Sequence, residues 1–247
     1  MQVRRTGILY GACVLLSLLP AMAGADMTIQ GRTGLPTVRE GQGQIWMHKG
    51  NVELKPGQGD LIVNQEYTLR LPGPPVKAMP VRAQIAVRED YFRSRDGHMP
   101  SVTSVEARGF QDFDVFVDGQ PVGVSVEPWH INAKGDTATR WRVWNMDFAP
   151  GQEHQMQIVS RAPLGEENGR AFIEFVSKDL GHWRESPDAL VIRYVPEESG
   201  TVAVAALAPK PGEHDSRQVE WIYRKGSPSR DIYILLPERG REQTTRQ

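Results

Sequence analysis

The chain has 247 residues, in which 29 Lys and Arg stand against 30 Asp and Glu, and its single cysteine is Cys13. This near-balance of charge argues against nucleic acid or an anionic membrane surface as the main partner. If the first 25 residues leave as a leader, Arg4 and Arg5 leave with them and the net charge becomes about −3. No cysteine then remains, which excludes disulfide bonds, thiolate-ligated metals and thiol nucleophiles from the mature protein.

Residues 1–25 have the order of a secretory signal peptide: two arginines, an uncharged and mostly apolar run over 7–19, then a proline and small residues. The apolar run is shorter than the roughly 20 residues that a membrane-spanning helix needs. We expect cleavage after Ala25, with Ala23 as the alternative. The sequence therefore predicts a periplasmic or secreted protein with no transmembrane segment in its mature part.

After an extended segment at 26–50, the region 51–237 shows period-two patterning interrupted by Gly, Pro, Asn and Asp, which is the pattern of strands. A short helical turn is expected around 181–188, and no stretch sustains a helical apolar face for three turns. Strands are expected at 60–73, 79–90, 101–110, 138–148, 153–162, 169–178, 188–195, 200–208, 217–225 and 230–237, and a hairpin of two strands at 113–128.

Many short strands at regular spacing predict an all-β protein with an antiparallel β-sandwich fold and few, short helical turns. The sandwich is either one elaborated domain or two β lobes that meet near 130–138, the most polar stretch in the middle of the chain. Residues 238–247 are charged and lack apolar side chains, so we expect a disordered tail.

The strongest local signal is a hairpin around Asp118-Gly119, which separates two runs of alternating valines. Both central positions of a type I′ turn need a positive φ, and Asp-Gly meets that need. We therefore assign Asp118 to the turn.

No catalytic or cofactor motif is present, and we predict neither a cofactor nor a metal site. The six histidines are isolated in sequence, without the close pairs typical of zinc or copper sites. Glu166 and Glu167, with Glu174 on the next strand, leave open a glycoside hydrolase. Such an enzyme needs two carboxyl groups roughly 5 to 9.5 Å apart across a cleft.

Tryptophan is the residue type best suited to bind a ligand, because its flat ring stacks on sugars and its N–H forms hydrogen bonds. Trp144 leads an apolar face with Met146 and Phe148 and is expected in the core. Trp141 lies on the opposite face of the same strand, among polar residues. Weak candidates for ligand binding are this boundary residue and the two tryptophans expected in loops, Trp129 and Trp183.

Four stretches of the chain resemble a family of exported bacterial proteins of unknown function. They are "FDVFVDGQPV", "RWRVWNMDFAPGQEHQMQIVSRA", "AFIEFVSKDLGHWRESPDALVIRYV" and "QVEWIYRKGSPSRDIYILLP". The resemblance covers roughly residues 50 to 237 and rests on strand-and-turn patterns, among them a Trp-bearing strand that runs into a Pro-Gly turn. It implies a Trp-rich β-sandwich and export, and it brings no activity and no site residues.

Three functions are compatible with these observations. The first is a non-enzymatic binding or envelope-associated protein with an unknown protein or glycan partner in the cell envelope. The second is a carbohydrate-binding module that uses exposed tryptophans. The third is a glycoside hydrolase without a recognisable motif.

Overall fold

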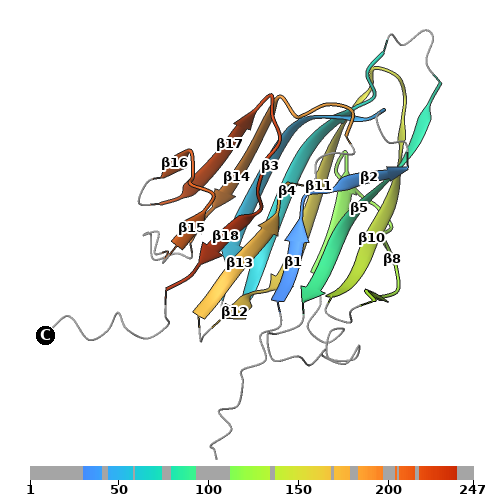
Figure 1. Ribbon diagram of the computed structural model, residues 1–247. Coiled ribbons are helices and arrows are strands. Elements are labelled where there is room, and N and C mark those ends of the chain that lie inside the picture. The colour runs from blue at the N-terminus through green and yellow to red at the C-terminus, as the bar shows by residue number, and fades with distance from the viewer. Residues whose placement is uncertain are drawn as a thin grey trace, which may run out of the picture.

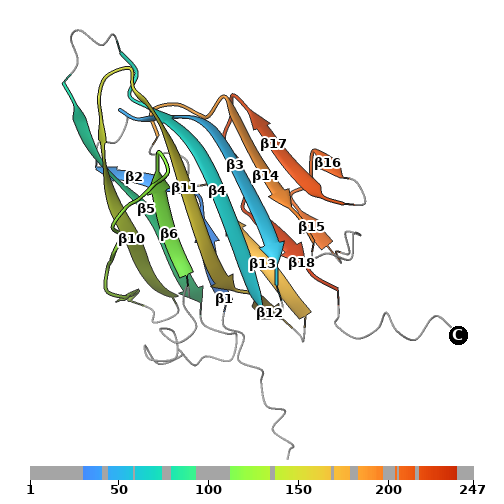
Figure 2. The ribbon, with the colours of Figure 1, turned by 180° about the vertical axis from the view of Figure 1, so that it is seen from behind.

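The computed structural model describes residues 30–40, 44–57, 59–73, 79–92, 112–133, 137–167, 170–178, 183–196, 204, 206–214 and 217–237. Their strands form two sheets that lie face to face, as Figures 1 and 2 show from opposite sides. The ten-stranded sheet contains β1 (Gln30–Gly34), β2 (Thr37–Glu40), β5 (Val81–Phe92), β8 (Ser125–Val126), β9 (His130–Ile131), β10 (Thr137–Phe148), β12 (Gly165–Glu167), β13 (Arg170–Val176), β15 (Ala206–Ala208) and β18 (Ile232–Leu235). The eight-stranded sheet contains β3 (Trp46–Pro56), β4 (Asp60–Arg70), β6 (Asp112–Val117), β7 (Gln120–Pro121), β11 (Glu153–Pro163), β14 (Ala189–Tyr194), β16 (Glu213–His214) and β17 (Val219–Arg224). The predicted all-β sandwich is confirmed.

The ten-stranded sheet has the order β15-β18-β13-β1-β5-β10-β8, and β12, β2 and β9 pair with β13, β5 and β10. The eight-stranded sheet has the order β16-β17-β14-β3-β4-β11-β6-β7. Most neighbours are antiparallel, but β1 pairs with β13 and β3 pairs with β14 in parallel. β1 thus lies between the late strand β13 and the early strand β5, and β3 lies between the late strand β14 and the early strand β4.

This order corrects one boundary of the expected organisation and decides between its two alternatives. The sandwich begins before residue 51, because β1, β2 and the start of β3 fall within the segment 26–50 and belong to the sheets. Strands from both sides of 130–138 pair in both sheets, as β5 with β10 and β4 with β11 do. The described strands therefore form one elaborated sandwich.

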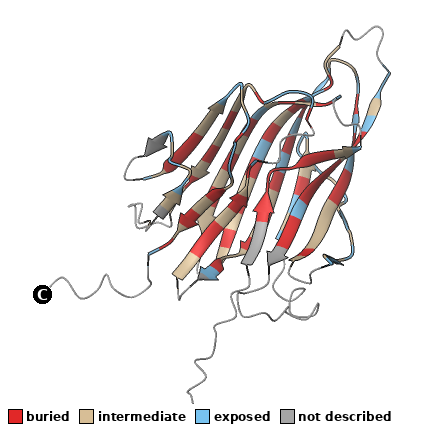
Figure 3. Ribbon diagram, in the orientation of Figure 1, coloured by how far each residue is buried: buried red, intermediate tan, exposed pale blue. Residues whose placement is uncertain are grey.

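Alternating side chains of each long strand meet between the sheets, and the buried positions alternate along the strands in Figure 3. On β4 the inward positions Leu61, Val63, Tyr67 and Leu69 are all at most 3% exposed. On β10 the inward Trp144 is 1% exposed. This core contains the large apolar area that a chain without disulfide bonds needs for stability.

The Asp118-Gly119 hairpin forms as expected, with φ of 50° at Asp118 and 78° at Gly119 between β6 and β7. Residues 183–185 form bends, so the expected short helical turn is not present there. The leader at 1–25, the expected strand at 101–110 and the tail at 238–247 lie outside the described residues. Within the described part of the chain, we find no helix of the length and apolarity that crossing a membrane requires.

Candidate functional site

The outer face of the ten-stranded sheet carries polar side chains where β5 and β10 pair. In this register Trp144 lies opposite Ile85, and both side chains are buried between the sheets. Because side chains alternate along a strand, Trp141 and its partner Arg88 point to the other face, as do Thr139 and Asp90. The pairing therefore presents an aromatic ring, a guanidinium, a carboxylate and a hydroxyl side by side on the outside of the sandwich.

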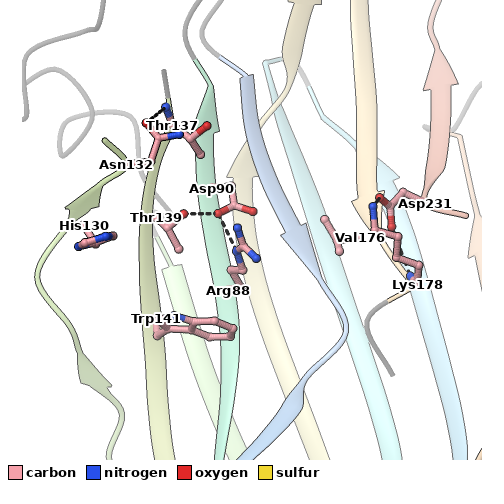
Figure 4. Close-up of a pocket in the computed structure, with 10 residues that line it drawn as sticks. All are labelled: Arg88, Asp90, His130, Asn132, Thr137, Thr139, Trp141, Val176, Lys178 and Asp231. Carbon is pink, nitrogen blue, oxygen red and sulfur yellow. Dashed lines mark hydrogen bonds and ion pairs between the residues drawn. The ribbon is translucent and has the colours of Figure 1, made fainter. Parts of the chain in front are cut away.

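These side chains line a hollow of about 550 Å³ on this face. Figure 4 shows its wall on the β9–β10 side and, beyond β1, a second wall from the end of β13 and the segment before β18. The lining residues are Arg88, Asp90, His130, Asn132, Thr137, Thr139, Trp141, Val176, Lys178 and Asp231. We call this hollow the Trp141 groove.

Trp141 is held in the groove by two arginines. The guanidinium carbon of Arg39 lies 5.3 Å from the ring centroid and that of Arg88 lies 5.9 Å from it, within the range of cation–π contacts. Arg39 forms an ion pair with Glu127, whose backbone N–H donates to the carbonyl of Trp141 over 2.9 Å. The indole is therefore fixed in orientation while it lines the groove.

The charges of the groove are compensated within it. Arg88 Nε donates to Asp90 Oδ1 over 2.8 Å, and Thr139 Oγ1 donates to the same oxygen over 2.6 Å. On the opposite wall Lys178 Nζ lies 3.0 Å from Asp231 Oδ2. Each cation thus has its own carboxylate, and the groove as a whole offers hydrogen-bonding groups without a dominant charge.

A glycine lets β1 lie close to the second wall. A Cβ added at Gly34 would come 2.5 Å from the carbonyl oxygen of Val176 and 2.7 Å from its Cβ. Gly34 and Val176 are partners in the parallel register of β1 and β13. The absence of a side chain at residue 34 therefore sets how closely β13 approaches the groove.

The three candidate tryptophans have different environments. Trp141 lines the groove. Trp129 does lie in a loop and is half-buried, but its ring is stacked on the guanidinium of Arg140 at 4.3 Å. For Trp183 the expectation of an accessible loop side chain was wrong, because it is 5% exposed and its Nε1 donates to the carbonyl of Pro36 over 3.0 Å.

The carboxylates considered for glycoside hydrolysis do not face each other. Glu166 is exposed and pairs with Ala171 across β12 and β13. Ala171 and Glu174 are three positions apart on β13 and so point to opposite faces of the sheet. Glu166 and Glu174 are therefore on opposite faces, and the side chain of Glu167 lies outside the described set.

Histidines and acidic residues form no group of three that could hold a metal ion in the described part of the chain. His130 lines the Trp141 groove, at its β9 wall. His154 is buried, at 8% exposed, and its Nδ1 lies 2.7 Å from Asp118 Oδ2. Asp118 thus forms the turn and also connects that turn to the core through His154.

Sequence reasoning missed most of the groove. Arg88, Asp90, Lys178 and Asp231 come from three separate regions of the chain, and only the strand pairing brings them together. The sequence offers one indication of the groove, which is that the residues of β5 on the face opposite to Ile85 and Val87 are polar. That pattern marks an outward face but does not distinguish a groove from ordinary surface.

No protein-family model and no curated protein sequence matches this chain. Among solved structures, its fold is similar to a protein of Legionella pneumophila described as a "putative nutrient binding protein". The TM-score is 0.59 and the identity 15%, over 85% of this chain and 71% of that one. At this identity the likeness shows the fold alone.

Two larger enzymes have a weaker structural similarity to this chain. They are an M1 zinc metallopeptidase of Deinococcus radiodurans, with a TM-score of 0.40 and 11% identity, and a leukotriene A4 hydrolase of Saccharomyces cerevisiae, with 0.40 and 8%. The matched region covers 78% of this chain in both cases, but 42% of the peptidase and 29% of the hydrolase. These two likenesses carry no argument about activity. The fold and the groove together define an all-β sandwich with a polar, tryptophan-lined hollow on one outer face.

Proposed function

We propose that the chain is a non-enzymatic binding protein whose Trp141 groove takes a small, uncharged, hydroxyl-rich molecule, of which a saccharide is the best chemical match. The observation that carries the proposal is the position of Trp141. Its ring is fixed by Arg39 and Arg88 in a hollow whose other walls are polar. Sugar rings present apolar C–H faces that stack on an indole, and hydroxyl groups that pair with surrounding donors and acceptors.

The pairing of charged side chains within the Trp141 groove supports the proposal that its ligand is uncharged. Arg88 is paired with Asp90, and Lys178 with Asp231. An anionic ligand would have to compete with these carboxylates, and a cationic ligand with the arginine and the lysine. A hydroxyl group can instead donate to a carboxylate and accept from the cation beside it, so it uses both members of a pair without separating them.

Export is the second part of the proposal. The signal-peptide pattern of residues 1–25 supports a periplasmic or secreted location. In either place the ligand would be a nutrient sugar or a glycan of the cell envelope. The Legionella protein with the similar fold is described as nutrient binding, which agrees with the first of these.

The proposal is tested by isothermal titration of the mature protein against neutral mono- and oligosaccharides and neutral cell-wall fragments. We expect saturable binding by wild type. The affinity should fall at least about tenfold in Trp141→Ala and by a smaller factor in Arg88→Ala. Arg82→Ala is the matched control, because Arg82 lies on the same face of β5 and its side chain is 70% exposed. Hydrolysis of a bound sugar, or binding that is unchanged in Trp141→Ala, would overturn the proposal.

A further inference from the structure

The Trp141 groove follows one row of residues that crosses the ten-stranded sheet on its outer face. Trp141 on β10 pairs with Arg88 on β5. When the antiparallel register of β5 and β1 is continued by two residues, Gly34 on β1 comes level with Arg88. Gly34 itself pairs with Val176 on β13. Because residues that are level on neighbouring strands point to the same face of a sheet, these four residues form a continuous row.

The row ends at Asp231, on the opposite wall of the groove. In the register of β13 and β18, Phe175 pairs with Ile232. Asp231 precedes Ile232 by one residue and therefore lies level with Val176. Ile232 is 0% exposed, so alternation turns the Asp231 side chain to the outer face. Figure 4 shows Trp141 and Asp231 on opposite sides of the groove that both of them line.

The row is longer than one sugar ring. Neighbouring strands of a sheet lie about 4.8 Å apart, so β10 and β18, four steps apart in the strand order, are separated by roughly 19 Å. A single pyranose ring covers about one such step. Gly34, in the middle of the row, adds no side chain that would separate the two walls. A saccharide that contacts both walls is therefore a chain of sugar units that lies across the strands.

The two walls carry the same kind of polar group, which is a carboxylate held in place beside a cation. On the first wall, Asp90 accepts a hydrogen bond from Arg88. On the second wall, Asp231 Oδ1 accepts from the backbone N–H of Ser177 over 3.1 Å and from that of Lys178 over 3.3 Å. Lys178 Nζ lies 3.0 Å from the other oxygen, Asp231 Oδ2. Both ends of the row thus present a fixed acceptor next to a donor.

The second wall has the chemistry to take a sugar unit of its own. The side chain of Asp231 is 14% exposed and that of Lys178 is 53% exposed. A carboxylate accepts about four hydrogen bonds and an ammonium group has three donors, so a hydroxyl group can be added to this pair without separating it. Val176 lies beside the pair and adds an apolar surface for the C–H face of the ring. Ser177 Oγ donates to the carbonyl of Arg230 over 2.9 Å, which ties the end of β13 to the segment before β18.

From this row we propose that the ligand of the Trp141 groove is an oligosaccharide that lies across the strands, and that Val176, Lys178 and Asp231 form a second sugar subsite. One sugar unit stacks on Trp141, and a later unit of the same chain reaches the second subsite. The inference rests on the proposed function, because it takes the groove to be a saccharide site. It adds the length of the ligand and its direction across the sheet.

The experiment is a calorimetric titration of the mature protein with neutral cello-, malto- and N-acetylated chito-oligosaccharides, each from the monosaccharide to the hexasaccharide. For the series that binds, we expect the affinity to rise at least about tenfold between the disaccharide and the tetrasaccharide, because the longer chain adds hydrogen bonds at the second wall. The affinity should level off at about four units, one for each step between strands.

Lys178→Ala is the test variant, because its side chain is half exposed and Asp231 keeps both backbone hydrogen bonds. We expect the ratio of the tetrasaccharide affinity to the disaccharide affinity to fall severalfold. Lys55→Ala is the matched control, since Lys55 is also a half-exposed lysine paired with a carboxylate, that of Glu53, but belongs to the other sheet. It should keep the wild-type ratio. Trp141→Ala should lower the affinity for every chain length.

The proposed function and the second subsite fail in different ways. If no neutral saccharide of any length binds, the proposed function is overturned and the second subsite with it. If binding depends on Trp141 but has the same affinity from the monosaccharide to the tetrasaccharide, only the second subsite is overturned. A ratio of affinities that is equal in wild type and Lys178→Ala would also overturn the second subsite alone.

Discussion

Trp141 and Trp144 are three positions apart on β10 and lie on opposite faces of the ten-stranded sheet. Trp144 is 1% exposed and packs between the sheets, with its ring centroid 6.2 Å from that of Phe113. Trp141 lines the outer groove between Arg39 and Arg88. One strand thus contributes to the core with one tryptophan and to the candidate binding site with the other.

The two tryptophans should differ in their effect on stability. Trp144→Ala is expected to lower the free energy of unfolding by about 3 to 5 kcal/mol, because it leaves a large cavity. Trp141→Ala is expected to cost about 1 kcal/mol, the size of its cation–π contacts. Urea denaturation followed by circular dichroism measures both values.

Trp144→Phe is the matched control for the core position. Its indole Nε1 has no hydrogen-bond partner in the described structure, so the phenyl ring loses volume but no hydrogen bond, and the cost should be well below that of alanine. A Trp144→Ala loss under 1 kcal/mol would mean that the two faces are assigned the wrong way round.

Removal of Glu89 should cost more than removal of Arg140. Glu89 is 0% exposed and accepts hydrogen bonds from Arg140 Nε and Arg142 Nε. Glu89→Gln leaves these two partly buried guanidinium groups without their carboxylate, and we expect a loss of about 3 kcal/mol in the free energy of unfolding. Arg140→Gln leaves the Glu89–Arg142 pair in place and should cost clearly less. Equal losses, measured by urea denaturation at low salt, would argue that Glu89 does not hold both arginines.

Gly34→Ala should destabilise the protein by about 1 to 3 kcal/mol, because the new methyl group would meet backbone of Val176 that cannot move freely. Gly123→Ala is the control, since a Cβ there has no neighbour within 4 Å and the position is exposed. Thermal unfolding of the two variants distinguishes them. Similar transition temperatures would contradict the close approach of β1 and β13.

Acid should weaken the Asp118–His154 contact. Desolvation raises the pKa of Asp118, but the Gln155 N–H, the His154 hydrogen bond and the charge of His154 together lower it below its usual 3.8. Because the folded pKa lies below the unfolded value, the carboxylate contributes stability above about pH 4 that is lost as the pH falls through the folded pKa.

Asp118→Asn tests this contribution, because Asn also tolerates the positive φ of 50° at this position. At pH 6 the variant should be less stable than wild type, and the difference should shrink as the pH falls to 3. Unfolding free energies measured across this range provide the check. A difference in unfolding free energy between wild type and Asp118→Asn that grows on acidification would contradict the lowered pKa of Asp118.

Local patterns were enough to predict much of the fold. The Asp118-Gly119 hairpin depends on turn chemistry within four residues, and the burial of Trp144 follows from alternation along one strand. For the same reason the strands expected at 60–73, 79–90, 138–148 and 153–162 end within about three residues of the bounds of β4, β5, β10 and β11. The parallel pairing of β1 with β13 and of β3 with β14 was not predictable, because no local sequence pattern indicates which distant strand pairs with each of them.

The candidate site could not be assembled from the sequence. The sequence around Trp183 predicts a loop, but its indole is buried and donates to the carbonyl of Pro36, 147 positions away. Likewise Arg88 and Trp141 become neighbours only through the register of β5 and β10. The sequence could place each residue on a face, but cross-strand register decides which faces meet.

The central claim, that Trp141 is the platform for a saccharide, is tested most directly by fluorine NMR of protein labelled with 5-fluorotryptophan. The chain has six tryptophans, and Trp141→Phe and Trp144→Phe assign the two resonances of β10. When a neutral saccharide that binds the protein is titrated in, the Trp141 resonance should shift in a saturable manner while the Trp144 resonance stays in place. A Trp141 resonance that does not move at saturation would contradict the account.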